Sequence, residues 1–113
     1  MFGFFNRKAD PSQVTPEDVQ SRQAAGEKLF ILDVREPAEY AEGHIAGSHN
    51  IPLGHLRQHL ADIPVDRQTI VHGQSGGRSP IAASLLQAQG RAAVIEMKDG
   101  MSGWQANQYP FER

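Results

Sequence analysis

The sequence predicts an α/β domain of three layers, α/β/α, in which helices flank a small central parallel sheet. Three apolar runs of strand length are continuous rather than alternating, which is typical of strands buried on both faces. These runs are "KLFILDV" (28–34), "QTIVHG" (68–73) and "RAAVIEM" (91–97). Segments with helix signals alternate with them, and short loops join the two kinds. This order indicates parallel strands connected by crossover helices.

The first helix, over 14–26, has the clearest local signals. Thr15 is a good N-cap, Pro16 fits the first helical position, and Asp18 lies where a capping box needs an acid. Gly26 supplies a residue suited to the C-terminal stop. We therefore predict a short helix that ends just before Gly26.

The remaining elements follow from similar patterns. We predict one more short strand and four helices, namely a strand at 47–52 and helices at 35–43, 53–63, 77–90 and 100–107. The helix at 53–63 is amphipathic, and the helix at 77–90 has apolar residues at Ile81, Leu85 and Leu86. We expect Met101 and Trp104 to pack in the core or against the outer wall of the loop at 73–78.

Length and composition bound the kind of protein. A chain of 113 residues can form one domain with a real core, and we predict it over 13–113, after an N-terminal tail at 1–12. The formal net charge of -2 predicts neither a nucleic-acid nor a membrane partner. The opening "MFGFFNRK" lacks the order of a signal peptide, and we interpret it as a partly ordered tail. The alternative is that Phe2, Phe4 and Phe5 dock on a partner or a membrane surface. We therefore expect a cytoplasmic protein.

The chain contains no cysteine, so it forms no disulfide, no thiolate metal site and no cysteine nucleophile of its own. His55 and His59 are four residues apart, which places both on one face of a predicted helix. No third ligand is evident for them, and His44 and His49 are five residues apart in a turn and strand region. We expect no metal and no cofactor.

The segment "IVHGQSGGRSP" carries the strongest functional signal in the sequence. A buried strand that leads through a tight glycine-rich loop into a helix can present several backbone N–H groups to an anion. We expect the loop glycines to supply left-handed or strained dihedrals and close approach to the backbone. Arg78 would add a permanent charge with forked donors. The predicted binding loop comprises Gly73, Gln74, Ser75, Gly76, Gly77, Arg78 and Ser79. An ordinary strand-to-helix turn, with Arg78 on the surface, is the alternative.

Three segments together resemble the rhodanese family of sulfurtransferases. These are "LDVREPAEYAEGHIAGSHNIP" (32–52), "VHGQSGGRS" (71–79) and "MKDGMSGW" (97–104). They resemble the family's Asp-Val-Arg signature with its Gly-His-Ile step, its active-site loop, and its closing Gly-Gly-Met-x-x-Trp motif. In the last motif Asp99 replaces the first glycine. The resemblance covers most of 13–106 and implies the rhodanese-like α/β fold.

The resemblance also implies what the loop does in the family. There the loop is a Cys, four further residues and an Arg, and the Cys carries a persulfide. The loop length here matches the sulfurtransferases and is one residue shorter than in the related dual-specificity phosphatases. Gly73 occupies the position of the Cys, whereas "QSGGRS" keeps the rest of the pattern. A thiolate reaction needs sulfur, and glycine offers no side chain.

Other residues do not replace the missing nucleophile. Ser75 would need a positioned base, and His72 is better explained as a structural histidine at a strand end. The resemblance implies that Asp33 and Arg35 support neighbouring loops through hydrogen bonds. The acids of the predicted helix starts, Glu39 among them, are interpreted as helix-start charges and solvated faces.

The sequence therefore predicts a catalytically inactive rhodanese-like domain that acts as a binding or regulatory module. Its partner would be a small anion such as thiosulfate, sulfate or phosphate, or a protein persulfide. The alternative is a thiosulfate or persulfide sulfurtransferase whose Cys a partner protein supplies, or whose native Cys has been replaced at Gly73 by engineering.

Overall fold

The computed structural model describes residues 12–113, so the predicted tail lies outside the described residues except for Ser12. The elements are β1 (Gln13–Val14), α1 (Pro16–Ala24), β2 (Phe30–Asp33), α2 (Pro37–Glu42), β3 (His49–Asn50), the 3-10 helix η2 (Leu53–Asp62), β4 (Thr69–His72), α3 (Arg78–Ala88), β5 (Val94–Met97) and α4 (Gly100–Ala106). No helix among these residues is both long enough and apolar enough to cross a membrane.

The five strands form one sheet in the order β1-β5-β4-β2-β3, and every neighbouring pair is parallel. Strand β4 lies at the centre, between β5 and β2. The predicted parallel sheet with crossover helices is therefore confirmed. The sequence reasoning missed β1, because a strand of two residues is too short to show a hydropathy pattern.

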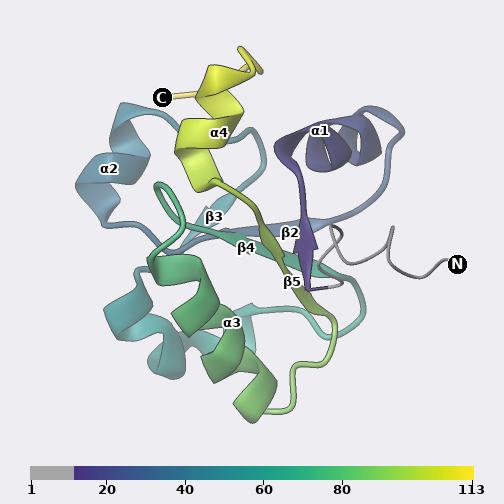
Figure 1. Ribbon diagram of the computed structural model, residues 1–113. Helices are drawn as coiled ribbons and strands as arrows, with labels where there is room; N and C mark the ends of the chain where they lie inside the picture. Colours follow the sequence, from purple (N-terminus) through teal and green to yellow (C-terminus); the bar gives the residue numbers. More distant parts are fainter. Residues whose placement is uncertain (1–11) are drawn as a thin grey trace, which may run out of the picture.

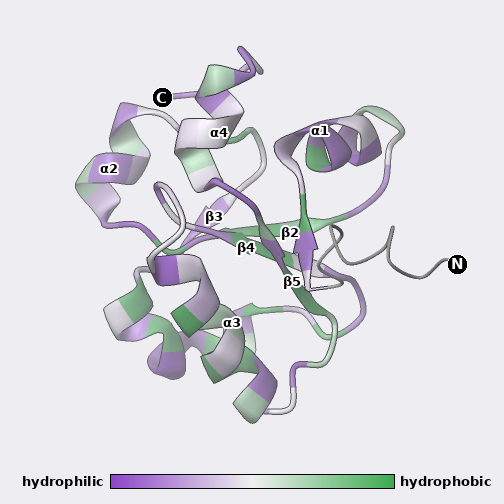
Figure 2. Cartoon of the chain, viewed as in Figure 1, coloured by the Kyte–Doolittle hydropathy of each residue, from purple (hydrophilic) through white to green (hydrophobic). Residues whose placement is uncertain are grey.

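Two separate cores cover the two faces of the sheet, which completes the three layers (Figure 1). Helices α1 and α4 pack on one face, and α3 and η2 pack on the other. Figure 2 shows the strands β2, β4 and β5 as a largely hydrophobic layer between helices whose outer surfaces are more polar. Alternate residues of one strand serve opposite cores, since Ile31 packs beneath α1 and α4 and Leu32 packs beneath α3.

The local signals of α1 are confirmed in detail. The Asp18 amide donates to Thr15 Oγ1 at 3.0 Å, and the Thr15 amide donates to Asp18 Oδ2 at 3.1 Å. Gly26 has a φ of +84°, the left-handed conformation that suits glycine after a helix end.

Two predicted helices differ from their sequence pattern. The segment 53–63 forms a 3-10 helix with a non-helical residue at His59, so the expected one-face pairing of His55 with His59 is wrong. A 3-10 helix has about three residues per turn, which moves residues four apart onto different faces. In α3, Ile81 is 58% exposed. The buried face consists instead of Ser79, Ala82, Ala83 and Leu86, whose mostly small side chains let α3 lie close to β4 and β5.

Candidate functional site: the loop after β4

The glycine-rich loop lies at the carboxyl end of the central strand. It leaves β4 after His72, passes between α2 and the start of α4, and enters α3 at Arg78 (Figure 1). In open parallel sheets this edge is where ligands bind. Ser75, Gly76 and Gly77 are exposed, whereas Gly73 is buried at the base of the loop.

The start of α4 anchors the loop through backbone hydrogen bonds. The Met101 amide donates to the Gly73 carbonyl at 2.9 Å, and the Ser102 amide donates to the Gln74 carbonyl at 2.8 Å. A Cβ on Gly100 would lie 2.4 Å from the Gly73 oxygen, so this position requires glycine. The segment "MKDGMSGW" thus acts on the loop by holding its carbonyls.

Asp99 occupies a position that favours glycine. Its φ is +65°, in the left-handed region, and its side chain makes no capping hydrogen bond to α4. An L-residue pays about 1–2 kcal/mol in this conformation, although Asp tolerates it better than most.

We expect Asp99→Gly to raise the free energy of unfolding by about 0.5–1 kcal/mol, because glycine removes the left-handed strain but also gains entropy in the unfolded chain. Urea denaturation of the full chain measures this change. Asp66→Gly is the matched control, because Asp66 is exposed and has no left-handed φ. Equal effects of the two substitutions would show that Asp99 is not strained.

The backbone amides of the loop are unpaired within the described part of the chain, where the N–H groups of Gly73 to Gly77 donate to no protein acceptor. Ser75, Gly76 and Gly77 are exposed, whereas Gly73 is buried. The expectation that these glycines supply left-handed dihedrals is wrong, since none of the loop glycines has a φ in that region. A Cβ on Gly76 or Gly77 would also meet nothing within 4 Å. Their contribution is two positions without a side chain of their own, which lets a ligand approach the backbone there.

Gly73 faces the start of α3. A Cβ built on it would lie 3.4 Å from Arg78 Cβ, 3.8 Å from the Ser79 amide nitrogen and 3.9 Å from Arg78 Nε. These are ordinary van der Waals distances, so a Cβ at position 73 would need no rearrangement of these neighbours. The direction of that side chain is toward the helix N-terminus and one edge of the Arg78 guanidinium.

Arg78 carries the expected charge at the start of α3, but Glu39 of α2 occupies its two terminal nitrogens. Arg78 Nη1 donates to Glu39 Oε1 at 2.7 Å, and Nη2 donates to Glu39 Oε2 at 2.9 Å. The Arg78 guanidinium holds the pKa of the Glu39 carboxyl at about 2, against an ordinary value of 4.5. Glu39 does cap α2, by accepting from the Glu36 amide at 2.8 Å, but its interpretation as a solvated acid is wrong. Glu39 lies in the segment 32–52 that resembles the family's Asp-Val-Arg signature, and this resemblance was the sequence signal available for its role.

The lowered pKa of Glu39 predicts a pH dependence of stability. A depressed pKa in the folded state stabilises the protein above pH 4.5, and this contribution is lost as the pH falls from 4.5 toward 2. The pair is about one-third exposed, so we expect a loss of about 1 kcal/mol after solvent screening. In Glu39→Gln this part of the acid destabilisation should be absent from urea denaturation curves. Glu42→Gln, on the same helix, should keep the wild-type pH profile.

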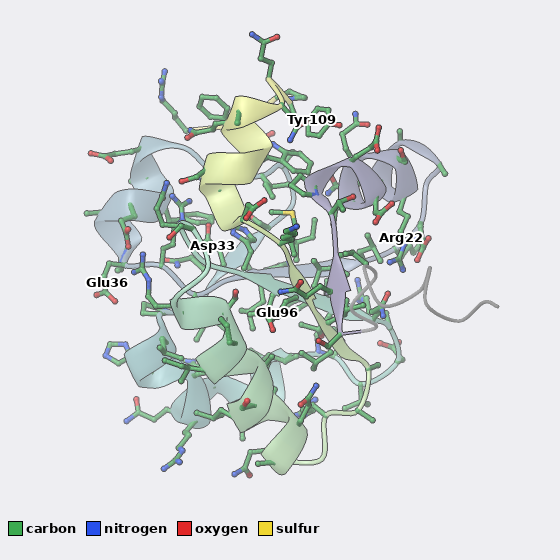
Figure 3. The ribbon with its side chains drawn as sticks, in the orientation of Figure 1. Arg22, Asp33, Glu36, Glu96 and Tyr109 are labelled. Atoms are coloured by element: carbon green, nitrogen blue, oxygen red, sulfur yellow. The ribbon has the colours of Figure 1, made fainter. Side chains whose placement is uncertain are left out.

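Asp33 and Arg35 form a buried ion pair that joins three segments. Arg35 Nη2 donates to Asp33 Oδ2 at 2.8 Å and to the Gly43 carbonyl at 2.7 Å. Arg35 Nη1 donates to Gln74 Oε1 at 3.0 Å, which ties the pair to the loop. Figure 3 shows Asp33 in the interior, in contrast to Glu36 on the surface. The pair therefore supports the loop from below without facing solvent.

His72 is not positioned as a base for Ser75. Its ring is fully buried, and Nδ1 lies 2.9 Å from the Gly73 carbonyl, which makes Nδ1 the donor. Among the described residues its Nε2 has no hydrogen-bond partner, and it lies 3.7 Å from Asp33 Oδ2. Burial lowers the pKa of His72, which keeps the ring neutral.

Ser79, the last residue of the predicted loop, bonds to strand β5: its hydroxyl donates to Glu96 Oε1 at 3.1 Å.

Three of the four other histidines contact an aromatic ring or a surface carboxylate. The His44 ring stacks on Tyr40, the His49 ring stacks on Phe30, and His59 Nδ1 lies 3.1 Å from Asp62. Over residues 12–113, no cluster of three or more His, Asp or Glu side chains could hold a metal ion.

Comparisons with known proteins identify the family of the chain. The family model described as a rhodanese-like domain matches residues 15–107. A sulfurtransferase of Allochromatium vinosum is 29% identical over 100 residues, which cover 88% of this chain and 94% of that protein. The thiosulfate sulfurtransferase of Stutzerimonas stutzeri is 32% identical over 103 residues, or 91% of this chain and 92% of that protein. In other relatives the match is part of a longer protein, such as 50% of a putative sulfur carrier protein of Bacillus subtilis.

Solved structures show the same fold. A rhodanese-related protein of Thermoplasma volcanium has a TM-score of 0.80 and 30% identity, over 88% of this chain and 96% of that chain. The rhodanese-like domain of an Anabaena protein has a TM-score of 0.83 and 30% identity, over 91% and 80%. The chain belongs to the rhodanese-like domain family, and it carries no cysteine.

Proposed function

We propose that this protein is a non-catalytic rhodanese-like domain that binds an anionic group in the loop after β4. The observation that carries the proposal is a row of free amides, from Gly73 to Gly77, beside a glycine at the family's reactive position. Loss of the nucleophile in the covalent enzyme subtilisin costs about a million-fold in rate, and no group near Gly73 replaces it here. Binding is the property that the remaining groups support.

The expected affinity is low. The N-terminus of α3 contributes up to about 2 kcal/mol toward an anion in favourable geometry. A charge-assisted hydrogen bond from the amides adds roughly 1.5–3 kcal/mol. A millimolar dissociation constant requires about 4.1 kcal/mol, so millimolar binding of a small anion fits these contributions.

Anion titration of the full chain, followed by amide NMR shifts, tests this proposal. We expect saturable shifts at the loop amides in the millimolar range and no transfer of sulfur from thiosulfate to cyanide. Arg78→Ala should weaken binding, whereas Arg57→Ala, an exposed arginine on η2, should not. Turnover by the pure protein, or equal affinity in the Arg78 variant, would contradict the proposal.

A second candidate function is sulfur transfer with a nucleophile supplied in trans. The space beside Gly73, with its nearest atom 3.4 Å from the Cβ position, favours it because the side chain of a partner's persulfidated cysteine could enter there. Several relatives are sulfurtransferases by name. A rise in sulfurtransferase rate when sulfur-carrier proteins are added would support this function, and no rise would count against it.

A further inference from the structure

A cavity of about 210 Å³ lies at the amino ends of β4 and β5, opposite the glycine-rich loop. Its walls come from the segment 64–69, which leads into β4, and from residues 90–94, which connect α3 to β5. Figure 1 shows this connection at the end of α3 that is remote from the loop. The eleven residues of α3 span about 16 Å between the two places. The cavity is therefore a separate site.

Thr69 brings an unpartnered hydroxyl to this cavity. The residue lines the cavity and is only 2% exposed, yet among the described residues its hydroxyl makes no hydrogen bond. Within 12–113, His72 Nε2 is the only fully buried side-chain polar atom without a partner, so the Thr69 oxygen still reaches open space. A buried hydroxyl costs free energy unless it is hydrogen-bonded. A water molecule or a polar ligand atom in the cavity would satisfy it.

The cavity also carries a net positive charge. Arg67 and Arg91 line it, and none of the described residues that line it is acidic. Arg91 donates to the Ile63 and Leu60 carbonyls at 2.6 and 2.7 Å and has no carboxylate partner among residues 12–113. Arg67 Nε lies 3.8 Å from the exposed Asp66, beyond hydrogen-bond distance, so its two terminal nitrogens are free. Two cations against one carboxylate leave one positive charge uncompensated.

The rest of the cavity lining is largely apolar. Pro64, Val65 and Val94 contribute to it, and Val65 is the most exposed of the large hydrophobic side chains in the described part of the chain. The planar fork of an arginine matches a carboxylate, and a hydroxyl can donate to the same group. Sites for drug-sized ligands begin at about 300 Å³, so this smaller cavity suits a ligand of few atoms.

We propose that this cavity binds a small monocarboxylate with a short apolar chain. The terminal nitrogens of Arg67 and the hydroxyl of Thr69 bind the carboxylate, and the chain lies against Val65 and Val94. Arg91 contributes its charge, because carbonyls already occupy its terminal nitrogens. The carboxylate comes either from a free acid or from the C-terminus of a peptide that ends in a small apolar residue. The proposal does not depend on anion binding at the glycine-rich loop.

Amide NMR titration of the full chain with butyrate tests the proposal. We expect saturable shifts in the millimolar range at the amides of residues 92–94. Thr69→Val and Arg67→Gln should each weaken this binding at least about threefold, because each removes a hydrogen bond to the carboxylate. Arg57→Gln, which removes an exposed arginine of η2 outside the cavity, should leave it unchanged. Inorganic phosphate should bind more weakly than butyrate, since it has no chain to place against Val65 and Val94.

The stability of Thr69→Val checks the premise about the hydroxyl. Valine keeps the β-branched shape that a strand favours, and no hydrogen bond within the described residues is lost. We therefore expect the midpoint of urea denaturation to stay the same or to rise. A clear fall would show that the hydroxyl has a partner in the protein, and it would overturn the proposal.

The outcomes at residues 92–94 decide the proposal and the source of the ligand. If butyrate shifts none of these amides, the cavity holds water only and the proposal is wrong. Equal butyrate affinity in both cavity variants, or tighter binding of phosphate, would also contradict it. Binding of a tripeptide that ends in valine, but not of its C-terminal amide, supports a peptide C-terminus, and binding of butyrate alone supports a free acid. The anion site of the loop is followed at residues 73–77, so failure of one proposal leaves the other intact.

Discussion

Gly73→Cys is expected to give measurable transfer of sulfur from thiosulfate to cyanide, where the parent protein gives none. The Cβ of the new side chain fits, because its position has no neighbour closer than 3.4 Å. It points toward the Ser79 amide at the start of α3, where a thiolate is stabilised. We expect the thiol pKa to fall from about 8.5 to about 7 or below, which titration of the thiolate absorbance measures. The rate gain should be at least about a thousandfold over background, because loss of the nucleophile costs about a million-fold in rate in subtilisin.

Gly76→Cys is the matched control for this experiment. It places a thiol in the same loop, in open space, without the contact to Ser79 and Arg78. We expect that variant to keep an ordinary thiol pKa and to show no sulfur transfer. An inert thiol with an ordinary pKa at position 73 would mean that the loop no longer has the geometry that sulfur transfer needs.

Arg35→Met is expected to lower the free energy of unfolding by about 3–5 kcal/mol, because it leaves the fully buried Asp33 carboxylate without its cation. The substitution also removes the hydrogen bonds to Gly43 and Gln74, so the loop loses its support from below. Urea denaturation measures the loss, and exchange of the Met101 and Ser102 amides, which donate to the loop carbonyls, reports the local release. We expect exchange at these two amides to rise more than exchange at β5.

The control variants separate the buried charge from lost packing. Arg67→Met removes an exposed arginine, 3.8 Å from Asp66, and should cost less than about 1 kcal/mol. Asp33→Asn in the Arg35→Met background removes the unpaired charge and should recover part of the lost stability. No recovery would show that packing of the Arg35 side chain, rather than the charge of Asp33, dominates.

Sequence reasoning located the glycine-rich loop in the fold but not the state of the charges around it. The strand, loop and helix order placed residues 73–79 at the carboxyl end of a central parallel strand, where the structure has them. It interpreted Glu39 as a helix-start acid, which describes its hydrogen bond with the Glu36 amide but not its ion pair with Arg78. Its bond to Arg78 joins residues that are 39 apart in the chain, and no local pattern reports such a contact. The loop glycines were likewise assigned a dihedral role that the backbone does not require.

The sequence by itself determined the strands β2 to β5, the cap of α1 and the loop, because hydropathy runs and capping residues act over a few residues, and its composition excludes a thiol. Only the tertiary structure decided that Arg78 is paired with Glu39, that α4 holds the loop carbonyls, and that a side chain at Gly73 would fit. These features depend on where separate crossover units come to lie after the sheet assembles, and packing of the two cores sets those positions.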